Sequence, residues 1–414
     1  MTTLERHLGL GRAIIVGLAA MIGAGVFYVW APAAAAAGTG LLIGLVIAGV
    51  IASLNALSSA QLAMAYPVSG GAYAFGRATL GPWWGFAAGW LFLAGKTASA
   101  GAIALIAGSY LWPEQSRAVA VAAVVVLGAA NMAGIRTTAG VSAVIVFTVL
   151  GGLLVVFAAI GFGGSLDDAH LDPGTMTDAG WYGILQSAGL LFFTFAGYAR
   201  MATLGEEVRD PRRTLPRAMI TALGITLMIY AVIGVLCVTI LGSAVLAAST
   251  APLADVLGGQ GPWTGLARAV AAIACLGSLI GILAGLSRTG LAMARERDLP
   301  GPLSRISERT HAPILAEATF GLAAIAGILL LGPARLVGFS ACAVLVYYAI
   351  AHLSALRQRP ADRWLPRAIQ YAGVAGCLLL AVTLPWPGVL AAAVWLAVGL
   401  LARGIRLALA ARAR

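Results

Sequence analysis

The chain alternates long apolar runs with short polar segments along its whole length. Each run holds about 17 to 25 mostly apolar residues, which is the length that a helix needs to cross a bilayer. Counting the runs between charged residues, proline and glycine predicts spans that begin near residues 12, 40, 83, 118, 139, 183, 215, 264, 313, 334, 367 and 388. The pattern therefore predicts an all-α polytopic membrane protein with about 12 transmembrane helices.

The first apolar run, from residue 13 to residue 37, is interrupted by two glycines, Gly23 and Gly25. Glycine lowers helix propensity by roughly 1 kcal/mol, and its missing Cβ lets backbone N–H groups approach a ligand. In lipid, non-helical backbone is tolerated only where protein buries it or where it lines a polar cavity. We therefore expect a binding site at this break. The alternative is a close helix crossing, which small residues also permit.

The sixth run contains a second interruption between Phe192 and Tyr198. Spans 1 and 6 are separated by five spans, which is the offset expected when two inverted repeats each contribute one discontinuous helix. We expect a single transport domain over residues 1–414, with a five-plus-five inverted-repeat core and discontinuous helices 1 and 6. Its first repeat covers residues 12–165, its second repeat covers residues 180–357, and two additional spans cover residues 366–411.

Composition supports the membrane assignment, because 61% of the residues are hydrophobic and only 10% are charged. The net charge of +11 is spread over loops, so it does not indicate a nucleic-acid partner. If the N-terminus is cytoplasmic, the outside loops carry only Arg117, Arg268 and Arg335, and most of the other arginines fall in the inside loops. We expect a multi-pass protein of the cell membrane with both termini in the cytoplasm. The first run is too long for a cleaved signal peptide.

Candidate metal chemistry is weak in this sequence. The four cysteines fall inside apolar runs at no metal-ligand spacing, so we expect small core residues and no disulfide or zinc site. Asp167, Asp168, His170 and Asp172 resemble one magnesium motif of a membrane prenyltransferase, but a second aspartate-rich run is missing. We therefore expect no enzyme activity, no metal and no cofactor.

Four motifs, taken in their order and spacing, make the chain similar to the amino acid-polyamine-organocation (APC) transporter superfamily. They lie in the first span, after span 2, in span 6 with the loop that follows it, and after span 8. The motifs are Ile22–Phe27, Pro67–Tyr73, Phe193–Tyr198 with Glu206–Pro211 and Leu215–Ala218, and Ala292–Pro300. The resemblance implies an amino acid permease that works by alternating access on an α-amino acid or amine.

The resemblance also implies which groups bind the substrate. Its α-carboxylate would meet backbone N–H groups of Gly23, Ala24 and Gly25, where the following half-helix favours an anion. Its α-ammonium would meet carbonyls near Ile22 and at Phe193, Thr194 and Phe195. The aromatic rings of Phe195 and Tyr198 would form a gate or a pocket wall, with packing against other helices or lipid as the alternative.

Two departures from the family pattern concern coupling to ions. Ala199 and Arg200 stand where many relatives have an acid, and Val149 aligns with a span-5 lysine of some proton-coupled members. The chain has one lysine, Lys96, in the middle of span 3. An ionisable group at this depth costs about 2.5 to 3.5 kcal/mol, so we expect a role in proton coupling. A structural lysine bound by backbone carbonyls is the alternative.

Several other polar residues lie at membrane depth, and most are expected to bridge helices. They are Asn55, Gln61, Ser278, Ser287, Ser340, Tyr347 and His352. Since spans 1, 3, 6, 8 and 10 carry no carboxylate at mid-depth, we expect a neutral amino acid as substrate. The sequence leaves open an exchanger, an exporter, or a membrane sensor that binds an amino acid without moving it. The expected partners are this small molecule, a proton and the lipid bilayer; the oligomeric state stays open.

Overall fold

The computed structural model describes residues 9–66, 70–134, 139–162, 172–198, 201 and 208–412. In this part of the chain, a helical stretch begins within four residues of each of the twelve predicted positions. Eight helical stretches are long and apolar enough to cross a membrane, and three more apolar helices are shorter. The prediction of an all-α polytopic membrane protein is therefore confirmed.

In the first half of the chain the helices are α1 (Leu10–Met21), α2 (Gly25–Tyr28), α3 (Trp30–Ala37), α4 (Leu41–Ala65), α5 (Ala72–Thr79), α6 (Pro82–Leu111), α7 (Ser116–Met132) and α8 (Ala139–Phe162). In the second half they are α9 (Gly180–Phe195), α11 (Pro211–Ala248), α12 (Pro252–Asp255), α13 (Pro262–Arg295), α14 (Ile314–Leu330), α15 (Pro333–Leu356), α16 (Arg367–Thr383) and α17 (Trp386–Arg412). Short 3-10 turns include η4 (Ala196–Tyr198) and η6 (Pro360–Asp362).

Two helices, α6 and α15, form the centre of the bundle. Most of their residues are buried, and they pack along each other. A Cβ built on Gly95 of α6 would lie 3.1 Å from the Cβ of Ala343 on α15, so the missing side chain lets these helices approach closely. In contrast, α17 leaves most of its apolar side chains exposed, as expected for a helix that faces lipid.

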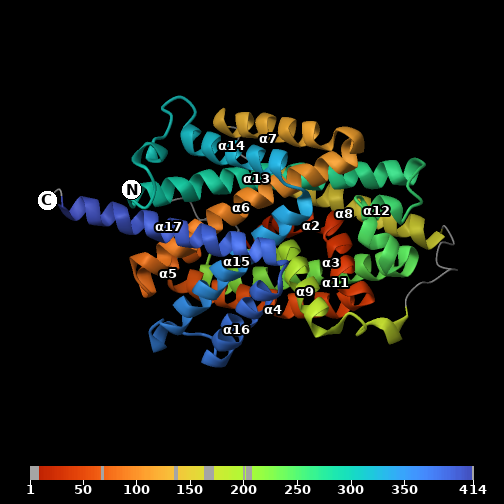
Figure 1. The fold of residues 1–414 in the computed structure, drawn as a ribbon, viewed down its shortest axis with the longest axis horizontal. Helices are drawn as coiled ribbons and strands as arrows, with labels where there is room; N and C mark the ends of the chain where they lie inside the picture. Colours follow the sequence, from red (N-terminus) through yellow and green to blue (C-terminus); the bar gives the residue numbers. More distant parts are fainter. Residues whose placement is uncertain are drawn as a thin grey trace.

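The helices run roughly along one long axis, so the bundle has two ends (Figure 1). The loop helix α5 and the last turns of α17 lie at one end, and the loop helix α12 lies at the opposite end (Figure 1). This arrangement agrees with the predicted alternation of loops across the membrane. The boundaries of the two inverted repeats stay a prediction.

Polar side chains inside the bundle mostly connect helices, as predicted. The His352 ring of α15 lies 2.7 Å from the Oδ1 of Asn55 on α4, and the Ser99 and Ser340 hydroxyls lie 2.6 Å apart between α6 and α15. The Gln61 amide of α4 donates to the loop after α15. The four cysteines are buried and free.

A buried ionic cluster, which we call the Asp298 cluster, joins α5, the end of α13 and α17. Asp298 is 5% exposed and accepts hydrogen bonds from the Tyr73 hydroxyl and from Nη1 of Arg77, both at 2.9 Å. Nη1 of Arg403 donates to its other carboxylate oxygen. Burial, and then the nearby Asp298 carboxylate, raise the pKa of Tyr73 well above its usual range, so the phenol stays a neutral donor.

The Asp298 cluster gives two of the sequence motifs a shared structural role. Tyr73 ends the motif after span 2, and Asp298 lies in the motif after span 8. Gly71, the N-cap residue of α5, has φ 55°, and a Cβ there would lie 2.6 Å from the hydroxyl of Tyr347. Arg403 is one of the arginines that the loop count assigned to the inside loops. It is instead 7% exposed within α17, where it pairs with Asp298 and lies 4.8 Å from the Phe86 ring centroid.

The Asp298 cluster predicts a large loss of stability in Asp298→Asn. Removing one partner of a buried ion pair costs about 3–5 kcal/mol. Here it would leave the buried Arg403 without its carboxylate, whereas Arg77 would keep its pair with Glu296. We expect a clearly lower thermal midpoint in detergent, measured by the loss of monodisperse protein on heating. The matched control is Asp210→Asn, because Asp210 lies 3.8 Å from Arg213 in an exposed pair worth at most about 1 kcal/mol. Equal midpoints for the two variants would contradict this prediction.

Candidate functional site

The first break separates α1 from α2. Helix α1 ends at Met21, and Ile22 leaves the helical region with φ −81° and ψ 71°. The Gly23 N–H donates to the Met21 carbonyl at 2.9 Å. Within the described residues, the N–H groups of Ala24 and Gly25 have no hydrogen-bond partner. The break therefore offers two backbone donors in a segment that is buried throughout.

The second break follows α9. That helix ends at Phe195, and the chain continues as the 3-10 turn η4. The Phe193 carbonyl accepts a hydrogen bond from the Ala196 N–H, and the Thr194 carbonyl accepts one from the Tyr230 hydroxyl at 3.0 Å. Two of the carbonyls predicted for the substrate ammonium thus already have a protein donor. Each carbonyl oxygen keeps a second lone pair for a ligand.

The two breaks cross each other at van der Waals contact. A Cβ built on Gly25 would lie 2.9 Å from the Cα of Thr194, and one built on Gly197 would overlap the carbonyl of Ala20. Both obstacles are backbone atoms, so they cannot rotate away. Close helix packing, the alternative for the first glycine pair, is therefore present at Gly25 together with the free backbone donors.

Two polar side chains join the breaks to the rest of the bundle. The Tyr230 hydroxyl on α11 lies 2.7 Å from the Met21 carbonyl of the first break and 3.0 Å from the Thr194 carbonyl of the second. It has one proton and so donates to one of them at a time. Lys96 on α6 donates from Nζ to the Ala196 carbonyl at 3.1 Å.

Sequence reasoning missed Tyr230. Its signal was present, since a tyrosine in the middle of an apolar span needs a partner for its hydroxyl. The Lys96 contact fits both predicted roles, because a lysine that binds a helix-end carbonyl can be structural or can act in coupling. The coupling role of Lys96 stays a prediction.

Ser278 on α13 differs from the other polar residues at membrane depth. Its hydroxyl oxygen is buried and has no hydrogen-bond partner, so it does not bridge helices as predicted. A Cβ built on Gly23 would overlap this oxygen. An unpaired buried hydroxyl costs free energy, and here it lies beside the unpaired backbone donors of the first break. These groups together form a polar surface that can accept a ligand.

The two predicted gate aromatics lie apart. Phe195 packs against Tyr230 with ring centroids 5.0 Å apart, and Tyr198 packs against Tyr348 on α15 at 5.0 Å. Both Phe195 and Tyr198 are fully buried. Phe195 thus packs against the tyrosine that contacts both breaks, and Tyr198 lies against the central helix α15. Their role as gate or pocket wall stays a prediction.

Several predicted positions lie outside the described residues. They are Pro67, Val68, Ser69, Asp167, Asp168, His170, Ala199, Arg200, Glu206 and Glu207. Val149, which aligns with the coupling lysine of some proton-coupled transporters, is buried in α8 and offers only an apolar side chain.

Comparison with known proteins agrees with this arrangement. Residues 8–401 match the amino acid permease family. An uncharacterized transporter of Mycobacterium tuberculosis is 50% identical, over 99% of this chain and 93% of the relative. The branched-chain amino acid permease BcaP of Bacillus subtilis is 28% identical, over 96% of this chain and 92% of the relative. The methylthioribose transporter of Bacillus subtilis is 27% identical, over 96% of this chain and 93% of the relative.

The helical fold, the two broken helices and these matches define a multi-pass membrane transporter and not an enzyme. The chain belongs to the amino acid permease family of the APC superfamily. Its expected superfamily is therefore confirmed.

The crossing geometry predicts different tolerances at the two glycines of the first break. Gly25→Ala pushes against the Thr194 backbone, and overpacking of this kind costs about 1–3 kcal/mol. We expect it to reduce substrate binding strongly, and Gly25→Val to abolish it. Gly23→Ala meets only the Ser278 hydroxyl group and its Cβ, which can shift, so we expect a milder loss.

Binding to purified, monodisperse protein is the measurement for these glycine variants. Gly281→Ala on α13 is the matched control, because a Cβ there meets nothing within 4 Å. Unchanged affinity in a monodisperse Gly25→Val protein would rule out a ligand site at this break.

Proposed function

We propose that this protein is a secondary active transporter that moves an α-amino acid across the cell membrane by alternating access. The observation that carries the proposal is the meeting of the two helix breaks. There the N–H groups of Ala24 and Gly25 and the hydroxyl of Ser278 are buried, and they have no hydrogen-bond partner among the residues that the structure describes. Helix breaks of this kind hold substrate near the midplane in transporters built from inverted repeats.

The substrate carboxylate would bind the N–H groups of Ala24 and Gly25, at the positive end of the half-helix that begins there. Ser278 would donate a further hydrogen bond. The ammonium would use the carbonyl groups near Ile22 and at Phe193, Thr194 and Phe195. The Tyr230 hydroxyl could then move between the Met21 and Thr194 carbonyls without losing its own hydrogen bond.

A neutral side chain fits this site best. The buried carboxylates of the described residues are Asp298, in its own ionic cluster, and Glu317 on α14, which accepts from Asn131 at 2.9 Å. Neither contacts a break, so a cationic side chain would lack a desolvated partner. The similarity to a branched-chain amino acid permease supports this preference. Because the chain is also similar to a methylthioribose transporter, the transport experiment below includes solutes other than amino acids.

Lys96 is the candidate coupling group. Its ammonium binds the Ala196 carbonyl of the second break, where some transporters place a sodium ion. Burial away from water disfavours the charged ammonium. Loss of its proton would turn this charge-assisted hydrogen bond into a weaker neutral one and so loosen the second break, which would couple proton movement to alternating access. In the alternative, Lys96 pairs with the substrate carboxylate directly.

Both chain ends are proposed to lie in the cytoplasm, because arginine is concentrated in the loops on that side. Exchange or export instead of uptake, and amino acid sensing without transport, are the competing functions. Accumulation against a gradient distinguishes a coupled transporter from both an exchanger and a sensor.

Uptake into proteoliposomes tests the proposed function. A panel of the twenty amino acids, with putrescine and methylthioribose, is measured with and without an imposed proton gradient. We expect accumulation of a neutral amino acid. Tight and selective binding of arginine or putrescine would contradict the neutral preference. Substrate binding without any transport or exchange would identify a sensor.

Lys96→Gln separates the two roles of the lysine. We expect loss of pH-dependent, gradient-driven accumulation, with substrate binding and exchange partly retained. A direct partner of the carboxylate would instead lose binding itself. Thr97→Val on the same helix is the matched control, because the Thr97 hydroxyl bonds only to the Leu93 carbonyl at 2.7 Å. If Lys96→Gln and Lys96→Ala both keep the wild-type rate and pH profile, Lys96 is structural.

A further inference from the structure

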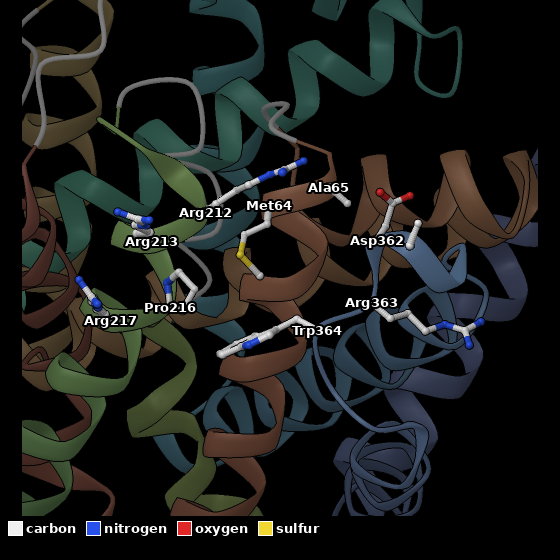
Figure 2. Close-up of a pocket in the computed structure, with 10 residues that line it drawn as sticks. Met64, Ala65, Arg212, Arg213, Pro216, Arg217, Asp362, Arg363 and Trp364 are labelled. Carbon is white, nitrogen blue, oxygen red and sulfur yellow. The ribbon is translucent and has the colours of Figure 1, made fainter.

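A basic pocket lies at the end of the bundle where α4 ends and α11 begins. It has a volume of about 400 Å³ and is also lined by the chain after α15, around η6. Figure 2 shows Arg212 extending from α11 across Met64, with the ring of Trp364 on the other side of that methionine. Arg213 and Arg217 extend from the same two turns of α11 (Figure 2).

The charge of this pocket is poorly balanced within the described residues. The first two turns of α11 carry Arg212, Arg213 and Arg217. The N-terminal end of a helix is the positive end of its dipole, and the first turn of α11 has no acidic residue. Among the carboxylates that the structure describes, one at 3.8 Å from Arg213 forms an exposed pair, and none pairs with Arg212 or Arg217. Asp362 on the pocket wall is paired with Arg359 instead. Three cations at a helix N-terminus favour a bound anion.

An apolar groove follows the same pair of helices toward the middle of the bundle. It is lined by Leu45, Val50 and Leu54 from α4 and by Leu227 and Ala231 from α11. Leu54 is ten residues before Met64, which is roughly 15 Å along a helix. The hydrocarbon core of a bilayer is about 30 Å thick, so one leaflet has about this depth. The near end of the groove therefore lies about one leaflet away from the pocket, where the chain end of a lipid bound in the pocket would reach.

We propose that the seam between α4 and α11 binds one anionic phospholipid. Its phosphate lies against Arg212 in the basic pocket, and Arg217 adds positive charge from the next turns of the same helix. One acyl chain follows the seam into the apolar groove. Trp364 is half exposed at the pocket edge and suits the membrane–water interface, where tryptophan is enriched. Basic pockets between helices on the cytoplasmic side of membrane proteins recognise such headgroups. This site is separate from the two helix breaks.

Lipid binding to the detergent-solubilised protein tests the proposed headgroup site. Phosphatidylglycerol and phosphatidylcholine with the same acyl chains are titrated, and bound lipid is counted by native mass spectrometry. We expect preferential binding of phosphatidylglycerol, and roughly tenfold weaker binding in Arg212→Gln/Arg217→Gln. The matched control is Arg305→Gln/Arg309→Gln, which removes two exposed arginines of the loop before α14 and should bind like the wild type. Equal loss in both double variants, or no loss in the first, would overturn the proposal.

The groove needs a variant of its own. Ala231→Phe fills the groove from an exposed position on α11, so it should weaken binding of the full-length lipid and leave the fold intact. Inorganic phosphate and glycerol phosphate are added as competitors. We expect weak competition that Ala231→Phe does not change. If either anion alone binds as tightly as phosphatidylglycerol, the occupant is a soluble phosphate and the lipid proposal fails. Unchanged lipid binding in Ala231→Phe overturns the acyl-chain placement.

Discussion

Backbone groups that are opened inside a membrane must find new partners, and the whole arrangement follows from this constraint. Unpaired N–H and C=O groups cost several kcal/mol each in hydrocarbon, so two broken helices survive only where other helices surround them. Here Tyr230 and Lys96 donate to carbonyls of the breaks, and the breaks cover each other at Gly25 and Gly197. Within the described part of the chain the N–H groups of Ala24 and Gly25 keep no partner, which is why we propose them as donors to an anionic group of the ligand.

The rest of the bundle holds this crossing in place. Tyr230 and Lys96 come from α11 and α6, so the breaks are tied to helices on different sides. Further along, the Asp298 cluster connects α5, α13 and α17 through short ionic contacts. The proposed alternating access would require the breaks to move relative to the central helices. Single hydrogen bonds at the breaks can change partners during that motion. The buried Asp298 cluster is better suited to keep α5, the end of α13 and α17 together as one unit.

Much of the fold could be predicted from the sequence, because span length and loop charge are set by the bilayer itself. The twelve helical stretches followed from the apolar runs, and both breaks followed from interruptions that contain glycine. The partners of the breaks could not be predicted, since Tyr230 is over 200 residues from Met21 and only the packing brings them together. Ser278 looked like any helix-bridging hydroxyl, and only its missing partner in the structure marks it. Arg403 was counted as a loop charge, because its partner Asp298 lies 105 residues earlier in the chain and only the packing brings the two together.

The central claim is that the free backbone donors of the first break bind the carboxylate of the substrate. Equilibrium binding to the purified protein tests it most directly. The best amino acid ligand is compared with its methyl ester and with the amine that lacks the carboxyl group. Loss of charge-assisted hydrogen bonds predicts roughly hundredfold weaker binding of both analogues. Equal affinity for the amino acid and the amine would contradict the account.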